Sequence, residues 1–142
     1  MKYSYKLSDA IHILTYLVIY KGSDLSSKAI ANSIETNAST VRSLMSNLKE
    51  AGLIVTRQGS ANSSLSISAN KITLLNVYRA INMDHNLLHV DPKTNPKCIV
   101  GGHIQETLNE VYADIQTSAF KQMDSITIQD IVDNVLKQNQ KK

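Results

Sequence analysis

The sequence of 142 residues predicts a mainly α-helical fold with one small β-hairpin, and three observations lead to that prediction. Apolar residues recur at helical spacing in several segments. Two short runs typical of strands, at residues 53–56 and 65–68, stand between those helical segments. A hydrophobic fraction of 42% with a charged fraction of 19% suits a folded chain and excludes a wholly disordered or collagen-like one.

Two helices are predicted in the first 34 residues. The first covers about residues 8–20, with Ser8 as its N-cap, and the second lies within residues 25–34, capped by Ser26. The apolar run at residues 10–20 is too short to cross a bilayer. We therefore expect a buried helix there and no membrane partner.

A third helix is predicted over residues 38–50, with Asn37 as its N-cap and Gly52 in the left-handed position that ends a helix. One face is apolar, because Val41, Leu44, Met45 and Leu48 recur at i, i+3, i+4 and i+7. The opposite face carries small polar side chains and one arginine: Ser39, Thr40, Arg42, Ser43, Ser46 and Asn47.

The middle of the chain predicts a hairpin and then a boundary. Residues 53–56 and 65–68 form the two expected strands around a polar loop. A further short helix is expected over residues 72–82. Residues 83–100 contain both prolines and are expected to be irregular.

A long helix is predicted to open at Gly101-Gly102 and to end near Met123. At 1.5 Å per residue it would be about 33 Å long. Its apolar residues alternate spacings of four and three, as in a helix that packs on another helix: Ile104, Leu108, Val111, Tyr112, Ile115 and Ala119. A last helix capped by Thr127 and a frayed tail at residues 137–142 are expected to follow.

This order of elements is that of a winged helix-turn-helix followed by a long helix. The third helix could lie in the major groove of DNA, where Arg42 could contact guanine with two hydrogen bonds. Arg57, at the base of the hairpin, could enter the minor groove. The candidate DNA-binding residues are Ser26, Ser27, Lys28, Ser39, Thr40, Arg42, Ser43, Arg57 and Gln58. The alternative is an ordinary solvated helix face.

Charge is unevenly distributed along the chain, whose formal net charge is +3. Residues 1–82 carry nine Lys and Arg against four Asp and Glu, whereas residues 83–142 carry six against eight. A basic first part permits binding to nucleic acid without requiring it.

The chain resembles the Rrf-type winged-helix regulators of bacteria, the family of the iron–sulfur cluster regulator, the nitric-oxide-sensitive repressor and the cysteine-metabolism repressor. The resemblance is carried by residues 26–31, Leu44 and Leu48, residues 49–54, Gly59 and residues 72–74. The second half, with Cys98 and Gly101-Gly102 before the long helix, is similar to the family's sensor loop and dimerisation helix.

The resemblance implies a homodimeric, cytoplasmic repressor that reads a palindromic operator in double-stranded DNA. Residues 1–82 would form the DNA-binding domain, residues 83–100 a sensor-type loop, and residues 101–142 the dimerisation helix and the C-terminal helix. The two recognition helices would lie about one DNA turn, ~34 Å, apart. Packing of the long helix within its own chain is the alternative to dimerisation.

Two departures from the family pattern matter. The family's wing usually carries Gly-Gly-Tyr, where this chain has Ser63-Ser64-Leu65. Cluster-binding members carry three cysteines before the long helix, and this chain has Cys98 alone. We therefore expect no iron–sulfur cluster and no other cofactor. The nearby His85, His89, Asp91 and His103 match no standard zinc spacing, so no metal site is expected.

Cys98 is either a redox sensor or an inert, small apolar residue. Its position before the predicted helix would place the thiol near the positive end of the helix dipole, which lowers a thiol pKa. A dimer would carry two such thiols, which allows a disulfide between subunits or a mixed disulfide with a small thiol. A single cysteine also suits a reducing cytoplasm.

The sequence does not indicate an enzyme. It contains no phosphate-cradling glycine loop, no HExxH and no GxSxG motif, and its carboxylates are scattered over polar faces. Two alternatives to a thiol-regulated repressor stay open. One is a winged-helix module that binds another protein, and the other is a regulator that responds to a small molecule.

Overall fold

The computed structural model describes residues 4–56, 62–81 and 86–141. The chain divides into two compact units, one formed by residues 1–83 together with 124–142 and the other by residues 84–123. Within the described ranges, no helix has both the length and the apolar character needed to span a bilayer.

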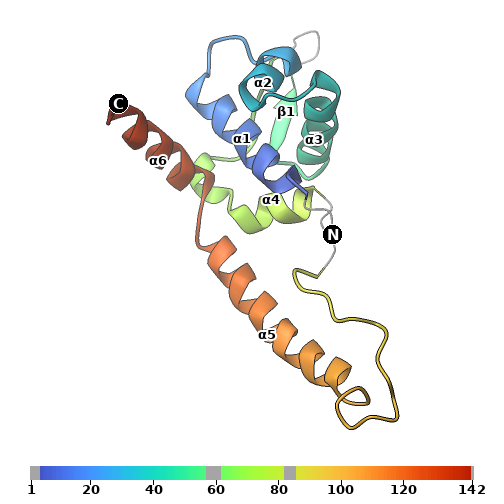
Figure 1. Cartoon of the computed structure of the whole chain (residues 1–142). Coiled ribbons are helices and arrows are strands. Elements are labelled where there is room, and N and C mark those ends of the chain that lie inside the picture. The colour runs from blue at the N-terminus through green and yellow to red at the C-terminus, as the bar shows by residue number, and fades with distance from the viewer. Residues whose placement is uncertain (1–3, 57–61, 82–85, 142) are drawn as a thin grey trace. The chain divides into compact units, whose positions relative to one another are not determined.

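The first unit contains five α-helices, a short 3₁₀ helix and a hairpin among its described residues (Figure 1). They are α1 (Lys6–Ile19), α2 (Ser27–Ile34), α3 (Ala38–Glu50), β1 (Ile54–Thr56), β2 (Ser63–Leu65), η1 (Ala69–Lys71), α4 (Leu74–Ala80) and α6 (Ile128–Gln140). The mainly helical fold with a small antiparallel hairpin is confirmed.

The helix caps follow the sequence prediction at three of four positions, which are Ser26, Asn37 and Thr127. The Ser26 hydroxyl accepts a hydrogen bond from the Ala29 N–H at 3.2 Å, and the Asn37 side chain accepts one from the Thr40 N–H at 2.8 Å. The prediction of Ser8 as N-cap was wrong, since α1 begins at Lys6 without a side-chain cap. The helix starts two residues before Ser8, and Leu7 in this first turn packs against the core.

The second strand lies earlier than predicted, at residues 63–65 instead of 65–68. Leu65 pairs with the buried Ile54, and Ser63 pairs with Thr56. The Ser66 N–H donates to the Leu53 carbonyl at 3.0 Å, which continues the same register by one residue. The assigned strand ends at Leu65, so residues 66–68 do not extend it as predicted.

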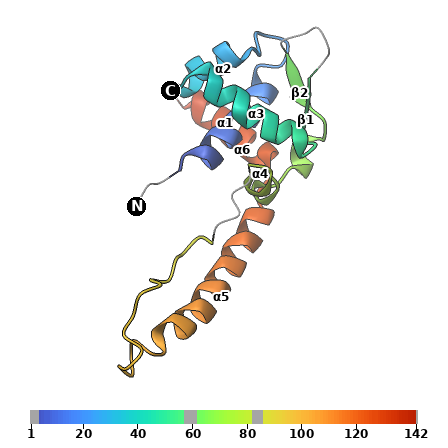
Figure 2. The same cartoon turned by 90° about the vertical axis from the view of Figure 1, so that its right-hand side faces the viewer.

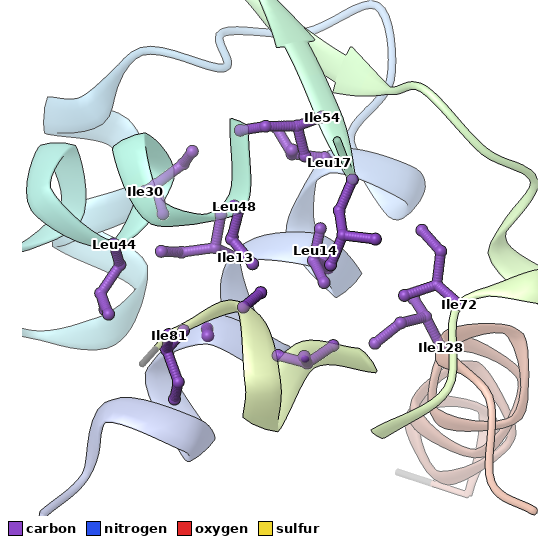
Figure 3. Packing of buried hydrophobic residues seen from close by; sticks show 14 of the residues in the cluster. Ile13, Leu14, Leu17, Ile30, Leu44, Leu48, Ile54, Ile72, Ile81 and Ile128 are labelled. Atoms are coloured by element: carbon purple, nitrogen blue, oxygen red, sulfur yellow. The ribbon is translucent and has the colours of Figure 1, made fainter. Parts of the chain in front are cut away.

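The core of the first unit draws on all of its helices. Figure 3 shows Ile13 and Leu14 of α1 among apolar side chains of the other elements. Its largest fully buried side chains are Ile13, Leu14, Ile30, Leu48, Ile54, Ile72, Ile81, Ile128, Val41 and Val77. Helix α1 contacts α2, α3, α4 and α6, so these four helices pack around it.

Helix α6 folds with the first unit. The Ile128 N–H donates to the Ile72 carbonyl at 2.8 Å, and the Leu74 N–H donates to the Ile126 carbonyl at 2.9 Å. Ile128 and Val132 are buried. The prediction grouped this helix with the long helix in residues 101–142, whereas the structure packs it with the first unit. The helix also continues to Gln140, although fraying was expected from residue 137.

The second unit consists of the segment 86–103 and α5 (Ile104–Asp124), apart from the last residue of that helix. The segment runs back along α5, since the Leu87 N–H donates to the Gln116 side chain at 2.8 Å. Helix α5 begins at Ile104, three residues later than predicted. Gly101 lies in the turns before it, where a Cβ atom would clash with the Asn95 carbonyl oxygen.

Candidate nucleic-acid interface

Helices α2 and α3 are joined by a tight turn built on one left-handed residue. Glu35 has φ of 64°, a conformation that few residues other than glycine adopt. The Thr36 N–H donates to the Ala31 carbonyl at 3.0 Å and closes the end of α2. Asn37 then caps α3. A polar break was predicted here, but its left-handed residue was not.

Helix α3 has one buried face and one exposed polar face. Val41, Leu44 and Leu48 are buried against the first unit. A second set of residues with the same spacing, i, i+3, i+4 and i+7, forms the exposed face: Ser39, Arg42, Ser43 and Ser46. Figure 2 shows α3 at the outside of the unit, in front of α1. The result is a continuous row of hydroxyl groups around one guanidinium, which we call the α3 polar face.

Thr40 does not join this face as a free hydroxyl. Its side chain is half-buried, and its Oγ1 donates to the Asn37 Oδ1 at 3.0 Å while its N–H donates to the same oxygen. The geometry therefore gives this candidate DNA contact a part in the cap of α3.

The candidates at the start of α2 also divide by role. The Ser26 side chain caps the helix, and hydrogen bonds from the Ser26 backbone and side chain lower the pKa of Asp24. Ser27 is half-buried. Lys28 is exposed and is the member of this group best placed to meet a phosphate.

The base of the wing is tied to the loop that precedes α2. The Asn62 side chain accepts a hydrogen bond from the Leu25 N–H at 3.2 Å, across 37 positions of sequence. No local sequence pattern marks Asn62 as a functional residue, because its contact joins distant segments of the chain. The predicted readers Arg57 and Gln58 lie outside the described residues.

The predicted dimer residues lie along α5. Ile104, Leu108, Tyr112 and Ala119 are half-buried, whereas Val111 and Ile115 are 46% and 47% exposed. No residue of this helix is buried in the described part of the chain.

Cys98 lies in the turns that precede α5 and is exposed. Backbone hydrogen bonds from the N–H groups of Gly101 and Val100 lower the pKa of its thiol. The direction agrees with the prediction, but its cause is local backbone donors rather than the dipole of α5. Such donors favour the thiolate, the form of cysteine that reacts with oxidants.

A three-helix support, a helix-turn-helix with a small polar reading face, and a hairpin after it define a winged helix-turn-helix protein. The chain belongs to the Rrf2 family, whose model, described as an iron-dependent transcriptional regulator, matches residues 3–134. YwnA of Bacillus subtilis (strain 168), named as an HTH-type transcriptional regulator, is 35% identical over 130 residues, covering 92% of this chain and 96% of that protein.

Solved structures agree with this assignment. A crystal structure described as that of a DNA-binding protein is 34% identical, with a TM-score of 0.71, over 89% of this chain and 97% of that one. CymR, the global cysteine regulator of B. subtilis, shares the fold at 21% identity, with a TM-score of 0.70, over 94% of this chain and 98% of that one. The chain is thus a DNA-binding transcriptional regulator and not an enzyme.

The donor atoms of the described residues do not fit the iron that the family description names. An iron–sulfur cluster is normally held by several cysteine thiolates, and the sequence has one cysteine. Among the described residues, no group of three or more His, Cys, Asp or Glu side chains is arranged to hold a metal ion. We therefore derive no function for this chain through iron.

Proposed function

We propose that this regulator is a cytoplasmic homodimer that represses transcription by reading a palindromic operator. The observation that carries the proposal is that one chain has two exposed surfaces, each suited to a different partner. One is the α3 polar face. The other is the apolar stripe of α5, which consists of Ile104, Leu108, Val111, Tyr112, Ile115 and Ala119. The first suits DNA, and the second suits a copy of itself.

The α3 polar face has the shape and chemistry that the major groove requires. Its small side chains allow close approach of the helix backbone, and serine hydroxyls can hydrogen-bond to phosphates or base edges. Arg42 lies in the middle of the row, where a guanidinium can pair with guanine O6 and N7. Lys28, exposed on α2, would hold a phosphate beside it.

The apolar side chains of helix α5 are only partly covered by the residues that the structure describes. It has 21 residues, about 32 Å of helix, and none of them is buried in the described part of the chain. A helix in water draws most of its stability from packing of an apolar face. A second copy of α5 would cover Val111 and Ile115 through a two-fold interface. A two-fold dimer reads a palindrome.

Binding to duplex DNA at several salt concentrations tests this function against a protein-interaction module. A dimer that contacts phosphates through basic residues releases counterions, so its affinity for duplex DNA should fall steeply as salt rises. Fluorescence anisotropy with a labelled genomic duplex library measures this fall. Absence of binding at low salt would favour the interaction module.

Arg42→Ala should weaken operator binding by about 1–3 kcal/mol and relax the base preference at one position of each half-site. The loss follows because alanine removes both hydrogen bonds to the base. Arg79→Ala is the matched control, since Arg79 is exposed on α4 and is not part of the α3 polar face. Anisotropy titrations on the operator and on single-base variants measure both effects. Equal affinities for the Arg42→Ala variant and the wild type would rule out the reading role of Arg42.

We further propose that Cys98, without any cofactor, makes DNA binding sensitive to oxidants. Hydrogen peroxide would oxidise the two thiols of a dimer to one disulfide and be reduced to two water molecules. The exposed thiol and its lowered pKa support this role. Peroxide should change the operator affinity of the wild type and leave that of Cys98→Ser unchanged. The same response in both proteins would make Cys98 an inert residue.

A further inference from the structure

The first unit contains a groove of about 420 Å³ that the reading of DNA does not use. Helices α1, α2 and α6 form its walls. Ile11, Ile19, Ile131 and Val135 supply apolar side chains, and His12 and Ser33 supply polar ones. Its size falls within the range of small-molecule sites in proteins.

The groove offers hydrogen bonds but no charge. The His12 Nε2 and the Ser33 Oγ lie 2.7 Å apart, which links α1 to α2. Burial lowers the pKa of His12, although Asp9 acts in the opposite direction, and the lowered pKa favours the neutral form of the imidazole. Among the described residues that line the groove, none is Asp, Glu, Lys or Arg.

Two tyrosine rings stand at the same groove. The centroids of Tyr16 and Tyr20 are 4.5 Å apart with an angle of 32° between the ring planes. Tyr20 is half-exposed, so one edge of the pair is open to solvent. Aromatic rings at such a site can contact a further aromatic ring, either by offset stacking or edge to face.

We propose that this groove binds a small, neutral aromatic compound that carries a hydroxyl group. The ring would lie between the tyrosine pair and the isoleucines, and its hydroxyl would hydrogen-bond to the imidazole or to the Ser33 hydroxyl. An ionised compound would lose hydration without meeting an opposite charge, which is costly. The chemistry of the walls therefore selects against carboxylates, phosphates and amino acids.

Such a compound would act on the reading elements through α2. Ser33 belongs to α2, the helix that packs beside α3, and Ile131 and Val135 belong to α6. A ligand that spreads α2 from α1 would move the α3 polar face. This second step rests on the proposed function, whereas binding in the groove does not.

Calorimetric titration of the full chain with 1-naphthol tests the binding step, with 1-naphthoate as the charged probe of the same ring size. Val135→Trp fills the groove from a half-exposed position, so the core is left intact. Lys137→Trp is the matched control, because residue 137 lies on the opposite side of α6 and does not line the groove. We expect 1-naphthol to bind the wild type and Lys137→Trp equally, and Val135→Trp at least about tenfold more weakly, about 1.4 kcal/mol. Naphthoate should bind none of them.

Three results would overturn the proposal: no binding of 1-naphthol, equal binding of both naphthalenes, or equal binding to the two tryptophan variants. A fourth such result could come from sedimentation equilibrium, which measures the oligomeric mass of the same variants. If Val135→Trp alone lowered the oligomeric mass, the groove would be an interface with a second copy. Operator affinity is measured separately with and without 1-naphthol. Loss of DNA binding in every sample would count against the proposed function and leave the binding result intact.

Discussion

Introducing two lysines into the exposed stripe of α5 should convert the dimer into a monomer and weaken operator binding by roughly 100-fold, about 3 kcal/mol. The variant is Val111→Lys with Ile115→Lys. Both side chains are nearly half exposed in the single chain, so the substitutions should leave the fold of the chain unchanged. In a dimer each pair of lysines would lie in an apolar seam, where an unpaired charge is strongly destabilising.

Sedimentation equilibrium measures the mass, and anisotropy measures the operator affinity. The matched control is Ala113→Lys with Thr117→Lys, two exposed residues with the same spacing on the other side of α5. It adds the same charge without touching the stripe. If the stripe variant remained dimeric and bound the operator as tightly as the control, α5 would not be the dimer contact.

Leu48→Ala should lower the free energy of unfolding of the first unit by about 2–5 kcal/mol. Leu48 lies on α3 with 0% of its side chain exposed, and it belongs to the core cluster in which α1 takes part. Truncation to alanine removes apolar contacts and leaves a cavity beneath the reading helix. A loss of this size is a large part of the stability of a typical small domain.

Urea unfolding followed by circular dichroism measures the change. Val55→Ala is the control, because Val55 is 48% exposed on β1 and its truncation should change stability by less than about 0.5 kcal/mol. A change below about 1 kcal/mol for Leu48→Ala would contradict the packing of α3 described above.

The parts of the fold that depend on local hydrogen bonds could be predicted from the sequence. Ser26, Asn37 and Thr127 each cap a helix through a residue three positions ahead, so the signal is contained in a few residues. Gly52 has φ of 80°, as its place at the end of a helix indicated. The amphipathic pattern of α3 likewise identified both of its faces.

The parts that depend on distant contacts could not be predicted. The packing of α6 depends on hydrogen bonds between residues 72–74 and 126–128, and the register of β2 depends on the pairing of Leu65 with Ile54. The same reason explains the missed role of Asn62. The cap role of Thr40 was missed because a hydroxyl on a helix surface can point to solvent or back to its own cap.

The central claim is that two copies of this chain read one palindrome, and selection of bound duplexes from a random pool tests it most directly. We predict an enriched consensus made of two inverted half-sites whose centres lie about one DNA turn apart, roughly 10–10.5 base pairs. The Arg42→Ala variant should select the same spacing with a weaker preference at one position of each half-site. A consensus without inverted symmetry, or no enrichment at low salt, would contradict the claim.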